Sequence, residues 1–160
     1  MKRYLVAFLM GFLACCGSAA QAAVERSLCV WDLLGANGET YNLMKDYRVA
    51  AVAWGVNFNL QVYSEEKIAA EDFRVGQCDA VVMTGLRTKP FNPFTGSLES
   101  IGTIPSYDHL RLVINALSST KAASLMTNGN YEVAGIVPFG GVYFFVNDRD
   151  INDVGKLAGK

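Results

Sequence analysis

Short apolar segments alternate with amphipathic ones along the first half of the chain, and this order limits the folds that it can adopt. Residues 27–34 are almost continuously apolar, whereas residues 56–64 alternate apolar and polar side chains; both patterns are typical of strands. Residues 78–84 are a third apolar run. Residues 41–54 and 65–76 between them have apolar side chains at helical spacing. The alternation predicts an α/β fold, with a mainly parallel sheet flanked by helices.

Capping residues and glycines predict where these elements begin and end. Thr40 and Ser64 precede the two helices as candidate N-caps. Gly55 and Gly76 follow them, where glycine commonly ends a helix. The strict alternation over residues 56–64 indicates one covered face and a place near the sheet edge.

The second half of the chain has weaker signals. A long loop with two prolines is expected over residues 87–97, and helices are expected after Ser106 and after Thr120. Residues 131–148 contain two strand-like runs, interrupted at residues 138–141.

The amino terminus has the pattern of a bacterial secretory signal peptide. Lys2 and Arg3 precede an apolar stretch over residues 4–14, and small residues then lead to Ala20-Gln21-Ala22. A membrane anchor is the alternative, but such a span takes roughly 20 apolar residues. We therefore predict a signal peptide over residues 1–22, cleavage after Ala22 and a periplasmic location.

Export affects the interpretation of the four cysteines. Cys15 and Cys16 lie in the predicted leader, where either could instead accept a lipid anchor, although the preceding residues match a lipobox poorly. Cys29 and Cys78 would remain, and in an oxidising compartment they are expected to pair. The alternative is two buried thiols. A disulfide would close a loop of roughly 50 residues and contribute about 4 kcal/mol through the entropy of the unfolded chain.

The composition and motifs exclude several classes of function. The net charge of −1 indicates no nucleic-acid partner. The single histidine, His109, has no cysteine or carboxylate at metal-ligand spacing, so no metal site is predicted. Phosphate-binding glycine motifs and the GxSxG nucleophile motif are missing from the sequence, and no cofactor is predicted. An enzyme remains an alternative only if Cys78 or Asp79 carries the chemistry.

The expected sheet itself indicates where a ligand would bind. In open parallel sheets, ligands bind beyond the carboxyl ends of the strands. Polar groups, small residues and a guanidinium follow three of the expected strands. The candidate ligand-binding residues are Asp32, Asn37, Thr84, Arg87, Phe139 and Gly140. Arg87 could hold a carboxylate through two parallel hydrogen bonds, or it could be an ordinary surface residue of a long loop.

Several segments, taken in order, resemble periplasmic solute-binding proteins. The sequence FRVGQCDAVVMTG, residues 73–85, is similar to the segment of that family in which a helix ends on glycine and a strand opens on aspartate. Residues 102–117 are similar to the proline-then-helix segment in the substrate-binding subunits of tripartite ATP-independent periplasmic (TRAP-type) transporters. Residues 135–160 resemble the stretch where such proteins leave their first lobe.

This resemblance implies a periplasmic-binding-protein type II-like fold that captures a small polar or anionic organic solute in a cleft between two lobes. Residues 23–147 would form the first lobe and residues 148–160 the start of the crossover to the second. The second lobe is then expected to be missing, as in a truncated chain. The partners would be membrane permease subunits or a sensor. Arg87 has no counterpart in the resemblance, and Cys29 and Cys78 are not general features of the family.

The resemblance also implies that the strands carrying Cys29 and Cys78 are neighbours, with both sulfurs near the sheet edge opposite the cleft. Two alternatives to solute capture stay open at this point. One is an exported α/β enzyme using Cys78 or Asp79. The other is an interaction module of the cell envelope with a repurposed binding-protein fold.

Overall fold

The structure is a computed structural model that describes residues 23–100, 102–141 and 145–159. The predicted signal peptide, residues 1–22, lies outside the described residues. The chain divides into two compact units, Met1–Val82 and Met83–Lys160, and each unit is described by itself.

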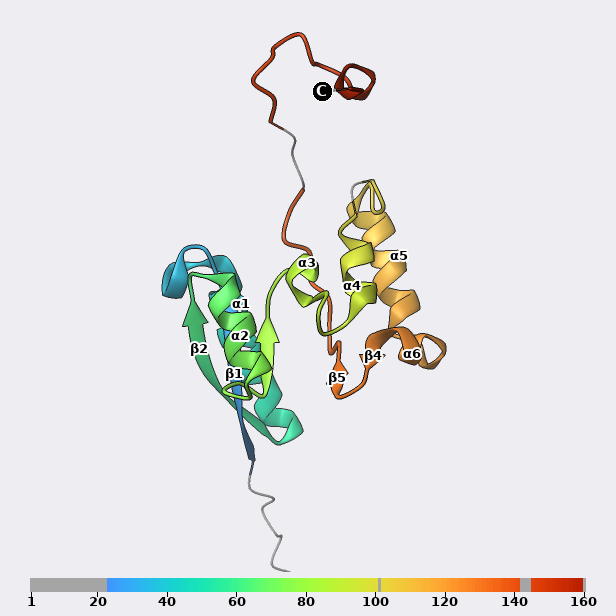
Figure 1. Cartoon of the computed structure of the whole chain (residues 1–160). Coiled ribbons are helices and arrows are strands. Elements are labelled where there is room, and N and C mark those ends of the chain that lie inside the picture. Colours follow the sequence, from blue (N-terminus) through green and yellow to red (C-terminus); the bar gives the residue numbers. More distant parts are fainter. Residues whose placement is uncertain (1–22, 101, 142–144, 160) are drawn as a thin grey trace, which may run out of the picture. The chain divides into compact units, whose positions relative to one another are not determined.

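The first unit is a parallel sheet with the predicted alternation of strands and helices (Figure 1). Its strands are β1 (Val24–Trp31), β2 (Val56–Tyr63) and β3 (Ala80–Val82), in the order β2-β1-β3. Both β2 and β3 run parallel to β1. Helix α1 (Glu39–Ala51) connects β1 to β2, and α2 (Glu66–Arg74) connects β2 to β3. The predicted fold class is confirmed, and β2 is an edge strand within the described sheet.

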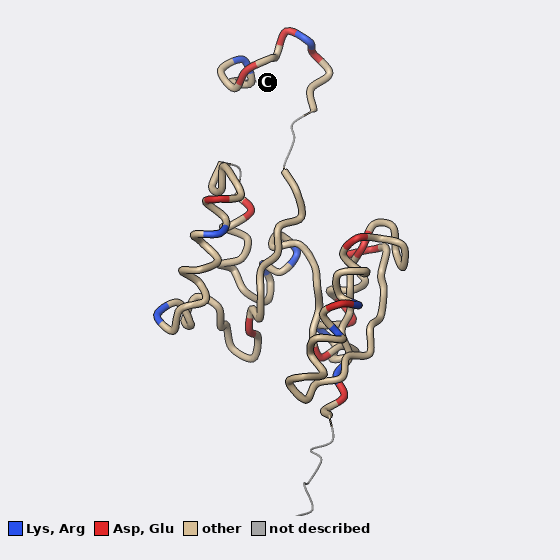
Figure 2. The backbone as a smooth tube through the Cα atoms, turned by 180° about the vertical axis from the view of Figure 1, so that it is seen from behind, with Lys and Arg blue, Asp and Glu red and all other residues tan. Residues whose placement is uncertain are grey.

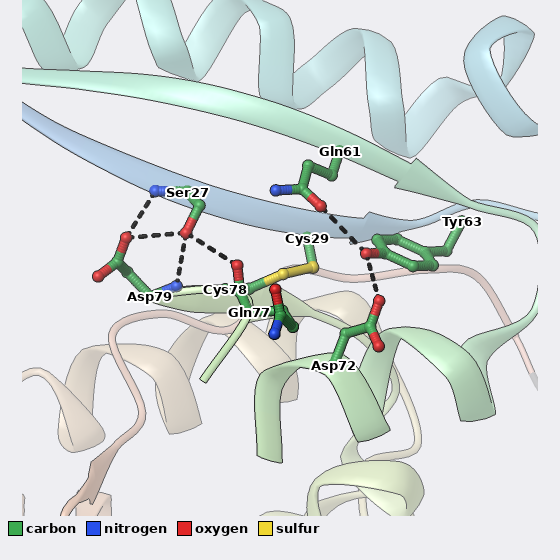
Figure 3. Close-up of a disulfide and its surroundings, with 8 residues drawn as sticks. All are labelled: Ser27, Cys29, Gln61, Tyr63, Asp72, Gln77, Cys78 and Asp79. Carbon is green, nitrogen blue, oxygen red and sulfur yellow. Dashed lines mark hydrogen bonds between the residues drawn. A yellow bond between two sulfur atoms is a disulfide. The ribbon is translucent and has the colours of Figure 1, made fainter. Parts of the chain in front are cut away.

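Alternate side chains of β1 supply the two faces of the sheet. Leu28 and Val30 are buried in one cluster with Met44 of α1. Cys29 points to the opposite face, where it bonds to Cys78 between the sheet and α2 (Figure 3). The central strand is thus covered on both sides, which is why its sequence is almost continuously apolar.

The helix ends agree with the glycine predictions and differ from the capping ones. Gly55 and Gly76 adopt positive φ values of 74° and 81°, directly after a short 3-10 helix η2 (Val52–Trp54) and after the end of α2. Thr40 is buried within the first turn of α1, whose N-cap is Gly38. The prediction that Thr40 caps this helix was wrong. The Asp32 carboxylate, from the preceding loop, accepts the hydrogen bond from the Tyr41 N–H that a capping side chain would otherwise accept. Glu65, rather than Ser64, is the N-cap of α2.

The regular structure of the second unit is mainly helical. Ser106 caps its longest helix, as predicted, by accepting a hydrogen bond from the backbone N–H of His109. Thr120 does not cap a helix, because it lies inside a 3-10 turn. The elements are α3 (Gly85–Thr88), α4 (Pro93–Leu98), α5 (Tyr107–Leu117), η3 (Thr120–Ala122), α6 (Ala123–Met126), β4 (Thr127–Asn128), β5 (Tyr131–Glu132) and η4 (Val154–Leu157).

Two predictions for this unit were wrong. The expected loop over residues 87–97 contains the end of α3 and most of α4, because Asn92 caps α4 by accepting from the Phe94 N–H and Pro93 occupies its first turn. Within residues 131–141 and 145–148, the described part of the strand-like runs, only Tyr131–Glu132 forms a strand, which pairs with β4. A β-strand needs a neighbouring strand for its backbone groups, and residues 133–141 have no strand partner in the described chain.

A disulfide joins the sheet to the segment before β3. Cys29 and Cys78 are bonded, with Cα atoms 5.9 Å apart, as predicted. Both side chains are buried, at 0% and 3% exposure. Their strands are neighbours, also as expected, but Cys29 pairs in register with Val81 and is the sixth residue of β1. The expectation that both sulfurs lie near the sheet edge opposite the cleft was wrong for Cys29, because β1 begins at Val24, before the apolar run.

Beside the disulfide, Tyr63 ties β2 to α2. Its hydroxyl lies 2.7 Å from Asp72 Oδ2 and 3.1 Å from Gln61 Oε1 (Figure 3). Burial, and then the hydrogen bond to the Asp72 carboxylate, raise the pKa of Tyr63 to about 12. The neutral phenol therefore stabilises the fold at all pH values below its ordinary pKa of about 10.

Removing the disulfide should lower the free energy of unfolding by about 4 kcal/mol, since the bond closes a loop with a sequence separation of 49 residues. The test is urea denaturation of the Cys29→Ala/Cys78→Ala variant. Reduced wild-type protein is the matched control, because it keeps the volume of both side chains. Equal unfolding midpoints for oxidised and reduced protein would contradict this role.

The Tyr63 contribution should be lost as the pH rises from about 10 to about 12, because ionisation of the phenol is unfavourable beside the carboxylate. Ultraviolet absorbance of tyrosinate should show a component that ionises late, near pH 12. Tyr63→Phe should remove that late component. Tyr107→Phe, at a side chain that is 63% exposed, should leave it unchanged. A folded protein whose tyrosines all ionise near pH 10 would refute the assignment.

Candidate functional site

The direction and the order of the strands together indicate where a ligand would bind at this sheet. The chain passes from β1 to β2 on one side, and β3 lies on the other side of β1. Loops that leave the carboxyl ends of two adjacent strands in opposite directions diverge, and the crevice between them is where ligands bind in open α/β sheets. In the first unit, this position belongs to the loop of residues 32–38, which includes the 3-10 helix η1 (Gly35–Asn37).

Asp32 organises this loop. Its carboxylate is buried, and Oδ1 accepts from the Leu34 N–H at 2.9 Å while Oδ2 accepts from the Tyr41 N–H at 3.1 Å. The Tyr41 N–H lies in the first turn of α1, where negative charge is favourable. The two oxygens thus bond to backbone of their own chain, and a direct bond from Asp32 to a solute stays a prediction.

Gly38 permits the close approach of Asp32 to α1. A Cβ atom at Gly38 would overlap the Asp32 carboxylate. No local sequence pattern singles out this glycine. Its role was not visible in the sequence because its partner precedes it by a whole loop and meets it only once the loop is folded.

Four side chains of this loop are exposed to solvent, and one of them is only the methyl group of Ala36. Leu33 and Leu34 are 67% and 72% exposed, and Asn37 is exposed beside them. The loop therefore presents two apolar side chains and one amide at the carboxyl end of β1. The two leucines were missed by the sequence analysis because they continue the apolar run, and β1 ends at Trp31, earlier than expected.

In the second unit, Thr84 and Arg87 lie on one helical turn. Thr84 is the N-cap of α3, and its Oγ1 accepts from the Arg87 N–H at 3.3 Å. The Glu99 carboxylate accepts from the N–H groups of Gly85 and Leu86, at 2.5 and 2.8 Å. The amino end of α3 therefore already binds a carboxylate of its own chain.

Phe139 and Gly140 lie in a segment without regular secondary structure. Phe139 is 60% exposed, and Gly140 has a φ of 118°, which favours glycine. Among the six candidates, Asp32 and Asn37 share one loop of the first unit, whereas the other four belong to the second. Their assembly into one site stays a prediction.

The residues considered for enzymatic chemistry have structural partners. Cys78 is disulfide-bonded, so it has no thiolate to act as a nucleophile. Asp79 accepts from the Ser27 N–H at 2.7 Å and from its hydroxyl at 2.8 Å (Figure 3). These bonds, with Arg26 nearby, lower the pKa of Asp79 and make it a weaker base. The exposed His109 shares a 2.8 Å hydrogen bond with Ser106, and the described residues contain no cluster of three potential metal ligands.

We expect Asp32 and Gly38 to be energetically coupled. Asp32→Ala should lower the free energy of unfolding by about 1–2 kcal/mol through the lost cap, and Gly38→Ala by about 1–3 kcal/mol through overpacking. The double variant should lose less than the sum, because removing the carboxylate makes room for the methyl group. Asn37→Ala, at an exposed position of the same loop, is the neutral control. Additive losses in denaturant titrations would show that the two residues act independently.

Two comparisons identify relatives of this chain. The family described as "Solute-binding protein AdeT 1/2" matches residues 48–160, more than half of the chain. A curated protein of Acinetobacter baumannii, named "Probable solute-binding protein AdeT1", is 43% identical over 134 residues. That alignment covers 82% of this chain and 43% of the relative, so the chain spans less than half of the relative's length. No solved structure matches the chain.

None of the described helices is both long and apolar enough to cross a membrane. With the parallel α/β unit and a family match over most of its length, the chain belongs to the AdeT 1/2 family of solute-binding proteins.

Proposed function

We propose that this protein captures a small polar or anionic organic solute outside the cytoplasm and delivers it to a membrane permease or a sensor. The observation that carries the proposal is membership of a solute-binding family. The first unit supports it, because its strand order leaves the β1 loop at the end of the sheet where α/β proteins bind ligands.

The proposed binding surface combines an apolar wall with a few polar groups, which is the usual composition of small-molecule sites. In the β1 loop, Leu33 and Leu34 would contact the carbon skeleton of the solute, and the Asn37 amide would donate to its oxygens. Asp32 would hold the loop in place through its bonds to Leu34 and Tyr41.

A separate group of candidates lies in the second unit and includes a cation. Arg87 is proposed to bind a solute carboxylate through its guanidinium, with Thr84 beside it on the same turn. Phe139 would add an aromatic wall, and Gly140 would let the backbone approach the solute closely. The amides at the start of α3 are not proposed as ligands, because Glu99 already accepts from them.

Capture is proposed to work by lobe closure, as the TRAP-type resemblance implies. A shift from mostly open to mostly closed needs on the order of 5 kcal/mol of preferential binding to the closed form. Since the alignment covers 43% of the relative, we propose that this chain forms one wall of the cleft that closes on the solute.

The proposed location is the periplasm, reached through a signal peptide at residues 1–22. The Cys29–Cys78 disulfide supports an oxidising compartment. The same bond argues against an enzyme using Cys78, and Asp79 is committed to Ser27.

A ligand screen tests this function directly. The protein, expressed from its own gene and purified from the periplasm, is heated with small mono- and dicarboxylates, amino acids and neutral sugars. At least one carboxylate should raise the melting temperature, and calorimetry should give a dissociation constant for it. Stabilisation by no class of solute would refute solute capture.

Two variants then test the site. Arg87→Ala should weaken binding of that carboxylate about 10- to 100-fold, because a charge-assisted pair is lost. Asn37→Ala should weaken it less, by a single neutral hydrogen bond. Val75→Ala, at a side chain that is 53% exposed after α2, is the matched control and should bind like wild type. Unchanged binding in both site variants would place the solute elsewhere.

A further inference from the structure

One edge of the sheet in the first unit has no partner among the described residues. Strand β2 pairs with β1 along its whole length, and the sheet ends there. The carbonyl groups of Gly55 and Tyr63 accept from the N–H groups of Val24 and Asp32, at 2.8 and 2.9 Å. In a regular strand, alternate residues face the same neighbour. The odd-numbered residues of β2 therefore bond to β1, and the even-numbered ones direct their N–H and C=O groups outward.

This edge has none of the usual protections against pairing. Its sequence, VNFNLQVY, contains no charged residue and no proline over eight residues. The register with β1 advances one residue at a time, so the strand has no bulge. Figure 2 shows β2 without charge along its length, at the side of the unit. Natural proteins protect edge strands with charges, prolines or bulges, and a long edge that lacks them is a template for another strand.

A second feature lies beside this edge. Four apolar side chains of α1 and η2 recur at spacings of four, three and four residues and form one exposed stripe. They are Leu43, Tyr47, Ala50 and Trp54, and Trp54 is 86% exposed. The ring of Tyr47 stacks on Phe58 of β2, with centroids 5.7 Å apart, so the stripe adjoins the edge strand.

Stripe and strand enclose an apolar groove of about 320 Å³. Its lining is Tyr47, Ala50, Ala51, Trp54, Val56 and Phe58. Exposed apolar surface of this kind, continuous with unpaired backbone groups, marks an interface. The outward N–H and C=O groups of β2 favour a β-strand as the partner. Because β2 and the groove carry no charge, they favour an uncharged strand.

We propose that the partner is a second copy of this chain, whose β2 pairs antiparallel with β2 across a twofold axis. Strand β2 of a second copy is itself a partner of this kind, because it is extended, uncharged and eight residues long. A twofold axis perpendicular to the sheet keeps both copies of α1 on the same face, so the two stripes meet above the joined strands. Two three-stranded sheets would form one sheet of six strands. The open edge runs along the length of β2, and the β1 loop lies at the carboxyl end of the sheet, where η1 contacts β2.

Sedimentation velocity of the oxidised wild-type protein, from about 1 to 100 μM, tests the dimer. A mass twice that of the chain is expected at the upper concentration. Trp54→Lys and Val62→Lys put a lysine on the stripe and on the edge strand, inside the proposed interface. Both should sediment as monomers and melt like the wild type at concentrations where the wild type is itself monomeric. Val49→Lys is the matched control, because Val49 is an exposed apolar residue on the far side of α1 (69% exposed) and should leave the dimer intact.

Hydrogen exchange of the wild type identifies the surface without any variant. On dilution from dimer to monomer, the outward amides of Phe58, Leu60 and Val62 should exchange faster, whereas those of Asn59 and Gln61 should not change. A monomer at every concentration would overturn the proposal. A dimer that survives both lysine variants, or whose dilution leaves the β2 amides unchanged, would overturn it equally.

Discussion

The burial of β1 is the constraint on which the first unit depends. This strand pairs with parallel neighbours on both sides and is covered by a helix on each face, so Cys29 and Val30 are completely inaccessible to solvent. Parallel pairing requires a crossover between consecutive strands, and the crossovers are the two helices that cover the sheet. The disulfide adds a covalent link between β1 and the segment that leads into β3, which has only three residues in its ladder. A short third strand is thereby held against the centre of the sheet.

The same constraint positions the proposed solute surface. Because β1 ends at Trp31 with its neighbours on either side, the chain must turn into α1 directly beyond it. Asp32 makes that turn stable by accepting N–H groups from both the loop and the helix, and Gly38 leaves room for it. The larger side chains that remain exposed are Leu33, Leu34 and Asn37. Asp32, one of the predicted ligand-binding residues, thus holds the loop in place, and its neighbours face solvent.

The two open surfaces of the first unit differ in chemistry and therefore in the partner that each suits. The β1 loop offers an amide and two separate leucines, which suit a small molecule. The β2 edge offers a row of backbone groups and an aromatic groove, which suit a strand. Under the proposed function, a dimer would present two solute-binding surfaces at once.

The sequence by itself determined the alternation of strands and helices, the glycine ends at Gly55 and Gly76, and the helix after Ser106, because each rests on local periodicity or on one backbone conformation. The pairing of Cys29 with Cys78 was also predictable once export was inferred. Only the tertiary structure decided the rest. Asp32 replaced Thr40 as the cap of α1 through a contact between residues nine positions apart. Residues 133–141 stayed outside any sheet, since a strand exists only where a neighbour accepts its hydrogen bonds. The open edge of β2 likewise depends on strand order, which no local pattern encodes.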